Sequence, residues 1–251
     1  MNEASYDTIG RTYTVTRRPD VRIAARILHA LGDARAVVNV GAGAGGYEPR
    51  DRLVIAVEPS RTMIRQRPPG AAAALQATAE AIPLRDASVE AALAVLTVHH
   101  WRDRERALAE IRRVASRRAV FLTCDPAFPG WWLTRDYFPM IRSRDRVRFP
   151  PLRAFRALGL VECSTVPVPW DCTDGFLGAF WRRPESYLDA RLRNNISSFA
   201  QLTRAELEPG LDRLGQDLAT GRWERRYAAL RPLAELDCGY RIVACELGPA
   251  G

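Results

Sequence analysis

A glycine-rich turn between two short apolar segments most constrains how this chain can fold. Residues Ala36–Val40 and Leu53–Glu58 are apolar enough to be buried strands. The run GAGAGG, which begins at Gly41, follows directly on the first strand. Glycines at such a turn let the backbone approach a ligand closely, because no side chain intervenes. The segment therefore predicts an α/β fold with a ligand at the carboxyl ends of parallel strands.

The rest of the first half alternates between strand and helix patterns. Apolar residues at helical spacing predict a helix from Pro19 to Leu31, which Gly32 would cap. A second helix is expected over residues 102–115, with arginines on its outer face. Further strands are expected at Ala73–Ala77, Val89–Val98 and Arg118–Cys124. This alternation predicts parallel strands joined by crossover helices.

The amino-acid composition changes after Asp125, where aromatic residues and prolines become frequent. We expect a helix over 151–159, a strand over 160–168, helical segments over 174–236 and a last strand at 238–247. Three parts are predicted within one compact domain: an N-terminal lid and first helix (1–35), a ligand-binding core (36–125), and further strands with a substrate cap (126–251).

Composition limits the classes of protein that the chain can represent. Of its 251 residues 47% are hydrophobic, which supplies a core, and the formal net charge is +8. All 37 basic residues are arginine, spread along the chain with one dense patch at Arg142–Phe149. Scattered arginines favour an adventitious basic surface over a nucleic-acid footprint. Without a membrane-length apolar run or a secretory signal, we expect a cytoplasmic protein.

The glycine string fits both GxGxxG and GxGxG, so its surroundings must identify the ligand. Glu58 ends the second strand, 17 residues beyond Gly41, where a carboxylate can bind both hydroxyls of a ribose. The turn is too short for a full helix, and it contains no cationic side chain before Arg50. A pyrophosphate is normally held by a helix N-terminus. A phosphate-free ligand such as S-adenosylmethionine is therefore favoured over a dinucleotide.

Consecutive blocks of the chain resemble one family of enzymes. The segments VVNVGAGAGGYEP, VIAVEPSRTMI, ATAEAIPLRDASVEAALAVLTVHHW and EIRRV resemble the signature blocks of class I S-adenosylmethionine-dependent methyltransferases, of the ubiquinone-biosynthesis-like small-molecule branch (methyltransferase domain 11 type). The resemblance covers residues 6–124. It implies a Rossmann-like, seven-stranded, mostly parallel sheet with helices on both faces, an antiparallel last strand and a helical, aromatic-rich cap.

The resemblance also implies which residues contact S-adenosyl-L-methionine, whose product is S-adenosyl-L-homocysteine. Glu58 would bind the ribose hydroxyls, and Leu96 with Thr97 would lie under the sulfonium. The expected contacts are Tyr13, Arg17, Asn39, Gly41, Ala42, Gly43, Glu58, Pro59, Met63, Thr78, Ala79, Glu80, Leu96 and Thr97.

Two features concern how tightly the cofactor is held. Asn39 stands where the family usually has an acid, two residues before the first glycine, and brings no charge. The segment from Tyr6 to Ile23 resembles the family's N-terminal lid, with Tyr6, Tyr13 and Arg17 closing over the cofactor and Arg17 meeting its carboxylate.

Methyl transfer from a sulfonium needs alignment and a dry pocket more than acid–base chemistry. His99 and His100 follow the fourth strand and are candidate bases, with pKa values expected near neutrality. No cluster has metal-ligand spacing, so we expect no metal. The candidate substrate residues are Asp125, Trp131, Trp132, Arg135, Tyr137 and Phe138.

These observations predict a methyltransferase acting by in-line displacement on a small organic acceptor, such as a specialised (secondary) metabolite. We expect a monomer or homodimer with no nucleic-acid or membrane partner. Three alternatives remain open: an RNA or protein methyltransferase, an NAD-linked oxidoreductase, and a protein that binds S-adenosylmethionine without methylating.

Overall fold

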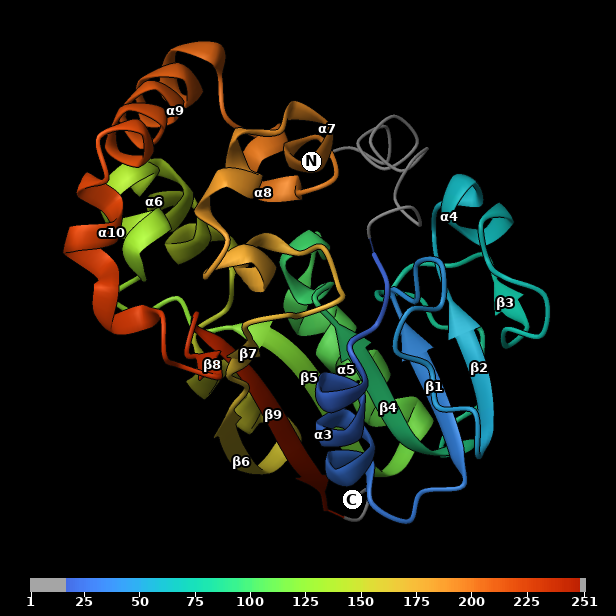
Figure 1. The fold of residues 1–251 in the computed structure, drawn as a ribbon. Coiled ribbons are helices and arrows are strands. Elements are labelled where there is room, and N and C mark those ends of the chain that lie inside the picture. The colour runs from blue at the N-terminus through green and yellow to red at the C-terminus, as the bar shows by residue number, and fades with distance from the viewer. Residues whose placement is uncertain (1–16, 249–251) are drawn as a thin grey trace.

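The computed structural model describes residues 17–248, and a seven-stranded sheet forms its centre (Figure 1). The strand order is β3-β2-β1-β4-β5-β9-β6. All strands run parallel except β9, which is antiparallel to both of its neighbours. The strands are β1 (Ala36–Val40), β2 (Leu53–Val57), β3 (Ala74–Leu75), β4 (Val89–Val95), β5 (Ala115–Cys124), β6 (Gly159–Thr165) and β9 (Tyr240–Leu247).

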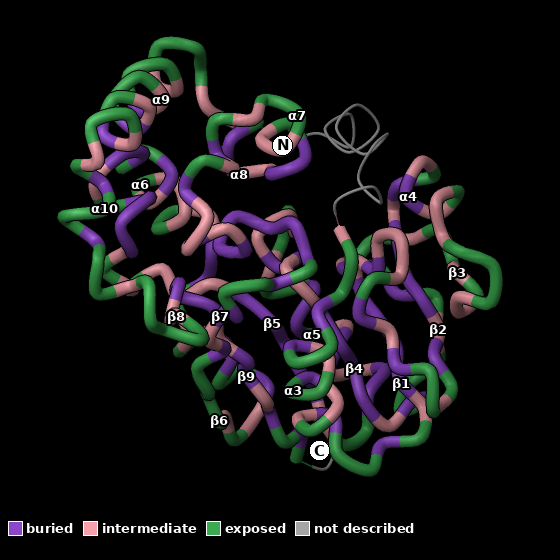
Figure 2. Tube along the Cα trace, viewed as in Figure 1, coloured by how far each residue is buried: buried purple, intermediate pink, exposed green. Residues whose placement is uncertain are grey.

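Two apolar layers enclose the sheet, because successive side chains of a buried strand point to opposite faces. Val37 and Val38 of β1 accordingly belong to different core clusters. Helix α3 (Val21–Leu31) covers one face, and its buried residues Ile23, Ile27 and Leu31 recur at helical spacing. Helix α5 (Arg104–Val114) covers the other face. Figure 2 shows the central strands almost wholly buried.

A cap lies beyond the carboxyl-terminal end of β5 (Figure 1). Its aromatic core joins Trp132 to Tyr187 and Trp223 through edge-on ring contacts. A two-stranded sheet of β7 (Val168–Pro169) and β8 (Glu235–Leu236) lies at its base. The cap helices are α6 (Pro139–Arg148), α7 (Ala190–Arg193), α8 (Ser197–Ala200), α9 (Arg204–Ala219) and α10 (Arg222–Tyr227).

The fold expected from the sequence is confirmed, with local differences at element ends. Strand β4 stops at Val95, short of the expected Val98, because Leu96 adopts a left-handed backbone with φ of +50°. The sequence did not predict α6 or the short helix α4 (Arg61–Arg65). Ile141 is the one buried residue of α6, so its apolar periodicity is weak. No helix in residues 17–248 has the length and apolar character needed to span a membrane.

Candidate functional site

The glycine turn closes tightly against the end of β4. Gly41, Gly43 and Gly45 all have positive φ, which shows that the GxGxG spacing describes the turn. A Cβ built on Gly41 would lie 2.1 Å from the Thr97 hydroxyl oxygen, so this position has no room for a side chain. The amides of Gly41 and Ala42 both donate to the carbonyl of Val57 in β2. The turn is thereby fixed between three neighbouring strands, with no helix following it.

Glu58 lies at the tip of β2 and faces this turn. Its side chain is buried, with the residue only 7% exposed. One carboxylate oxygen accepts from the amide of Gly43 at 2.8 Å and the other from that of Ser60 at 2.9 Å. Burial raises the pKa of Glu58, while these two hydrogen bonds and Arg67 act in the opposite direction. A carboxylate has about four acceptor positions, so the two amides leave capacity for further donors.

The residues expected around an adenine gather beyond β2. Ser60 caps α4, accepting from the amide of Met63, and the Met63 side chain lies buried against Gly43. Ala79 is buried, whereas Pro59 is partly and Thr78 largely exposed. The Glu80 carboxylate accepts from the backbone amides of residues 102 and 103, at the turn before α5. The Glu80 side chain therefore stabilises the turn before α5.

Asn39 is part of a buried polar network that sequence reasoning missed. Its amide nitrogen donates to Glu48 at 3.1 Å, and its oxygen Oδ1 has no hydrogen-bond partner among residues 17–248. Glu48 pairs with Arg67 at 2.6 Å, and both side chains are less than a tenth exposed. Arg67 also donates to the carbonyl of Gly43. A carboxylate thus reaches the Asn39 position from the far end of the turn, with its charge balanced by Arg67.

Leu96 and Thr97 lie at the same edge of the sheet, next to the glycine turn. A left-handed backbone is unusual for leucine and is a form of strain that clusters at functional sites. The Leu96 amide donates to the carbonyl of Leu122 in β5, which holds this conformation in place. Thr97 therefore adjoins Gly41, and Leu96 precedes it at the end of β4.

The two histidines differ from the expectation for a base. His99 stacks on Phe149, and its ring lies 3.9 Å from that of His100. Burial, followed by the nearby Arg148, lowers the pKa of His100 to about 3. Burial also lowers the pKa of His99 well below its usual value. The expected pKa near neutrality is therefore wrong for both, and each ring stays neutral at physiological pH.

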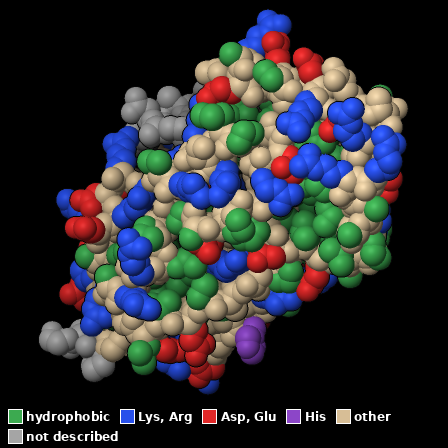
Figure 3. Space-filling model, turned by 90° about the vertical axis from the view of Figure 1, so that its left-hand side faces the viewer, with side chains coloured by type: hydrophobic (Ala, Val, Ile, Leu, Met, Phe, Trp, Pro, Cys, Tyr) green, Lys and Arg blue, Asp and Glu red, His purple; other side chains and the backbone are tan. Residues whose placement is uncertain are grey.

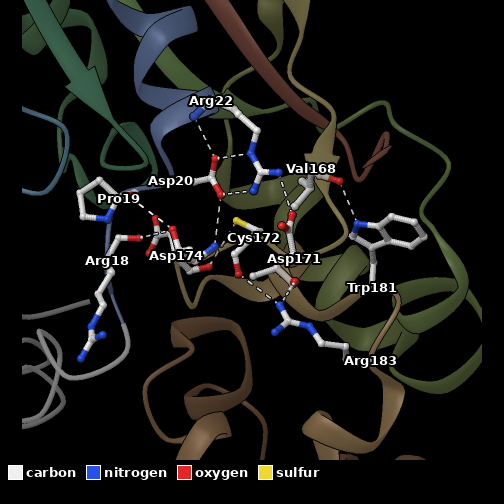
Figure 4. A network of polar contacts seen from close by, with 12 residues as sticks. Arg18, Pro19, Asp20, Arg22, Val168, Asp171, Cys172, Asp174, Trp181 and Arg183 are labelled. Carbon is white, nitrogen blue, oxygen red and sulfur yellow. Dashed lines mark hydrogen bonds and ion pairs between the residues drawn. The ribbon is translucent and has the colours of Figure 1, made fainter. Parts of the chain in front are cut away.

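The start of the described chain is tied to the glycine turn and the cap. Tyr6 and Tyr13 lie outside the described residues. Arg17 forms an ion pair with the buried Asp174, which also accepts from the Tyr47 hydroxyl at 2.9 Å. Asp20 caps α3 and accepts from the amide of Thr173, so a second carboxylate joins the same segments (Figure 4). Arg17 thus binds a carboxylate of the protein itself.

The candidate substrate residues separate into three groups. Asp125 and Trp131 line a pocket at the end of β5. Trp132, Tyr137 and Phe138 pack inside the cap: Trp132 donates to the carbonyl of Trp181, and Tyr137 donates to Asp217. Arg135 is exposed beside Asp136. The described part of the chain contains no group of three or more His, Cys, Asp or Glu side chains suited to a metal ion.

Comparison with known proteins identifies the family. A methyltransferase domain model matches residues 38–123, which include the glycine turn, Glu58 and β4. A crystal structure from Anabaena variabilis, of a protein provisionally named a methyltransferase of an antibiotic biosynthesis pathway, is 35% identical. The match covers 92% of this chain and 99% of that one, with a TM-score of 0.83. This chain belongs to the class I S-adenosylmethionine-dependent methyltransferases. The cofactor expected from the sequence is thereby confirmed.

More distant structures resemble the methyltransferase in fold alone. One from Thermotoga maritima, provisionally named a histamine N-methyltransferase, is 18% identical with a TM-score of 0.54, covering 98% and 96% of the two chains. The geranyl diphosphate C-methyltransferase of Streptomyces coelicolor, crystallised with S-adenosyl-L-homocysteine, is 13% identical with a TM-score of 0.50, covering 91% and 76%. No protein with a curated description matches the methyltransferase.

Proposed function

We propose that this methyltransferase transfers a methyl group to a small organic acceptor, of the kind found among specialised metabolites. The observation that carries the proposal is the buried carboxylate of Glu58 at the tip of β2, which faces the glycine turn that follows β1, the neighbour of β4. Strand β5, the next along, ends in a pocket on the same edge. Donor and acceptor sites on neighbouring strand ends are what a direct transfer requires.

The residues around the turn fit S-adenosyl-L-methionine, which supplies a methyl group already activated on a sulfonium. Glu58 has acceptor capacity left for two ribose hydroxyls, and Met63 and Ala79 offer an apolar surface for the adenine. The unpartnered Asn39 oxygen, buried below the turn, is a hydrogen-bond acceptor for the donor's ammonium group. These contacts need no phosphate-binding helix.

The protein's contribution to the transfer is alignment and exclusion of water. Leu96 and Thr97 hold a rigid floor beside Gly41, which keeps the methyl group in line with an acceptor coming from the β5 side. The neutral histidines lie behind this edge against Phe149 and Arg148. With pKa values this low they are weak bases, so we assign them a role in packing the loop rather than in proton transfer.

The surface supports a small acceptor over RNA. Figure 3 shows arginines intermixed with carboxylates and apolar patches over one face of the molecule. Many arginines are paired, such as Arg113 with both Glu110 and Asp86. A nucleic-acid footprint needs a continuous stripe of unpaired cations. We therefore place macromolecular acceptors second.

Transfer of isotopically labelled methyl from S-adenosylmethionine tests the proposal. Three reactions run in parallel contain a panel of phenols and amines, total tRNA, and a mixture of unstructured peptides. We expect label in a small-molecule product together with one equivalent of S-adenosyl-L-homocysteine. Label only in tRNA or peptide contradicts the small acceptor. Tight binding of S-adenosyl-L-homocysteine without transfer in any reaction favours a protein that binds the cofactor and does not methylate.

A further inference from the structure

A pocket lies at the carboxyl-terminal end of β5, and two residues of α6, Arg142 and Asp145, form part of its wall. Its cavity volume is about 40 Å³ and it opens to solvent, so it has room for one end of a small molecule whose remainder lies in the opening. Residues from β5, the segment after it, α6 and the start of β9 contribute to its wall. The lining residues used below are Cys124, Asp125, Phe128, Trp131, Arg142, Asp145 and Tyr240.

Asp145 is the one lining carboxylate that no other group of the described chain binds. The Asp125 carboxylate accepts a hydrogen bond from the backbone amide of Ala127 at 2.9 Å, within its own turn. In contrast, no hydrogen bond or ion pair within residues 17–248 reaches the Asp145 carboxylate, although it is partly buried. Burial raises its pKa to about 6, and Arg148 opposes this shift. Such a group is deprotonated near neutral pH and able to accept a proton.

The charges and rings around Asp145 indicate the chemistry of a ligand. Three aromatic rings line the pocket, from Phe128, Trp131 and Tyr240. Its carboxylates outnumber its guanidinium groups by two to one, although the whole chain carries a net charge of +8. The titratable and charged groups that face Asp145 are Cys124, Asp125, Arg142, Arg148 and Tyr240. Aromatic faces with an unpaired carboxylate favour an organic ammonium ion.

The pocket adjoins the edge where the donor would lie. Cys124 ends β5, the direct neighbour of β4, and neighbouring strands are separated by about 5 Å. Leu96, at the end of β4, packs against the same apolar cluster as Trp131 and Tyr240. The pocket and the end of β4 thus lie at the ends of two adjacent strands.

We propose, resting on the function proposed above, that this pocket binds an amine acceptor and that Asp145 pairs with its ammonium group and takes its proton. Loss of that proton frees the nitrogen lone pair. The nitrogen then forms a bond to the methyl carbon while the carbon–sulfur bond breaks and its electron pair stays on sulfur. The products are the N-methylated ammonium ion, the neutral thioether S-adenosyl-L-homocysteine and protonated Asp145, which releases its proton to solvent.

Three probes of one shape test this assignment: 2-phenylethylamine, 2-phenylethanol and phenylacetate. Their binding to the wild-type protein saturated with S-adenosyl-L-homocysteine is followed by ligand-detected NMR and calorimetry. We expect the amine to bind at least tenfold more tightly than the alcohol, and phenylacetate to be rejected. Equal or weaker binding of the amine overturns the proposal, as does the absence of binding by all three.

The variant Asp145→Asn removes the charge and keeps the shape. We expect about a tenfold or greater loss of amine affinity, little change for the alcohol, and unchanged affinity for S-adenosyl-L-homocysteine. Asp212→Asn, at an exposed position of α9, is the matched control and should change none of these values. Unchanged amine binding in folded Asp145→Asn overturns the role of this residue. Failure of S-adenosyl-L-homocysteine to bind the wild type is a separate result, which contradicts the donor site.

Discussion

Replacing Gly41 by alanine tests how tightly the glycine turn is built. The residue has φ of +70°, a backbone that costs an L-amino acid about 1–2 kcal/mol. The added Cβ would also lie 2.1 Å from Oγ1 and 2.8 Å from Cβ of the buried Thr97. Overpacking of this kind costs about 1–3 kcal/mol. Together the two effects predict that Gly41→Ala lowers the free energy of unfolding by about 2–5 kcal/mol.

Two other glycines separate the backbone cost from the steric cost. Gly70 has φ of +81° but no heavy atom within 4 Å of an added Cβ, so Gly70→Ala should cost only about 1–2 kcal/mol. Gly46 has no positive φ and a nearest contact at 3.7 Å, so Gly46→Ala should be close to neutral. Chemical denaturation of the three variants, followed by circular dichroism, gives the ranking. A loss for Gly41→Ala no larger than that for Gly70→Ala would refute the reasoning.

Three further predictions concern buried ionisable side chains. Arg67→Met leaves the Glu48 carboxylate buried without its partner and should destabilise the protein by about 3–5 kcal/mol, with partial recovery on adding Glu48→Gln in denaturation experiments. Asp174→Ala should lower the free energy of unfolding by about 3 kcal/mol, because it removes the acceptor of the Tyr47 hydroxyl and breaks a buried ion pair. Tyr47→Phe removes only the hydroxyl and should lower the same free energy by about 1 kcal/mol. The folded-state pKa of His100, about 3, lies below its usual value of 6.5, so the stability that depends on its neutral form falls as pH drops from 6.5 towards 3. His100→Gln should flatten this dependence between pH 7 and pH 5, and an unchanged slope contradicts the shift.

The sequence predicted those parts of the fold that local patterns determine. Continuous apolar runs located β1, β2 and β5, because strands buried on both faces need no polar alternation. The spacing between the glycine turn and Glu58 predicted that Gly41 and Glu58 lie close together, because each follows one of two neighbouring parallel strands. The antiparallel last strand followed from family resemblance rather than from its residues.

Local sequence patterns did not predict contacts between residues that lie far apart in the chain. Arg142–Phe149 was noticed only as a basic patch, because the burial of Asp145 depends on β5 and β9 packing against α6. The network from Asn39 through Glu48 to Arg67 likewise forms only when the turn folds back on itself. Low pKa values for the histidines required knowledge of Phe149 and Arg148 as neighbours.

Calorimetric titration with S-adenosyl-L-homocysteine, on the wild type and on Glu58→Gln, tests most directly whether Glu58 and the glycine turn form the donor site. A parallel titration uses NAD. We predict that S-adenosyl-L-homocysteine binds the wild type, binds Glu58→Gln at least tenfold more weakly through loss of charge-assisted hydrogen bonds, and is not displaced by NAD. Equal affinity in both proteins, or displacement by NAD, would contradict the donor site at the tip of β2.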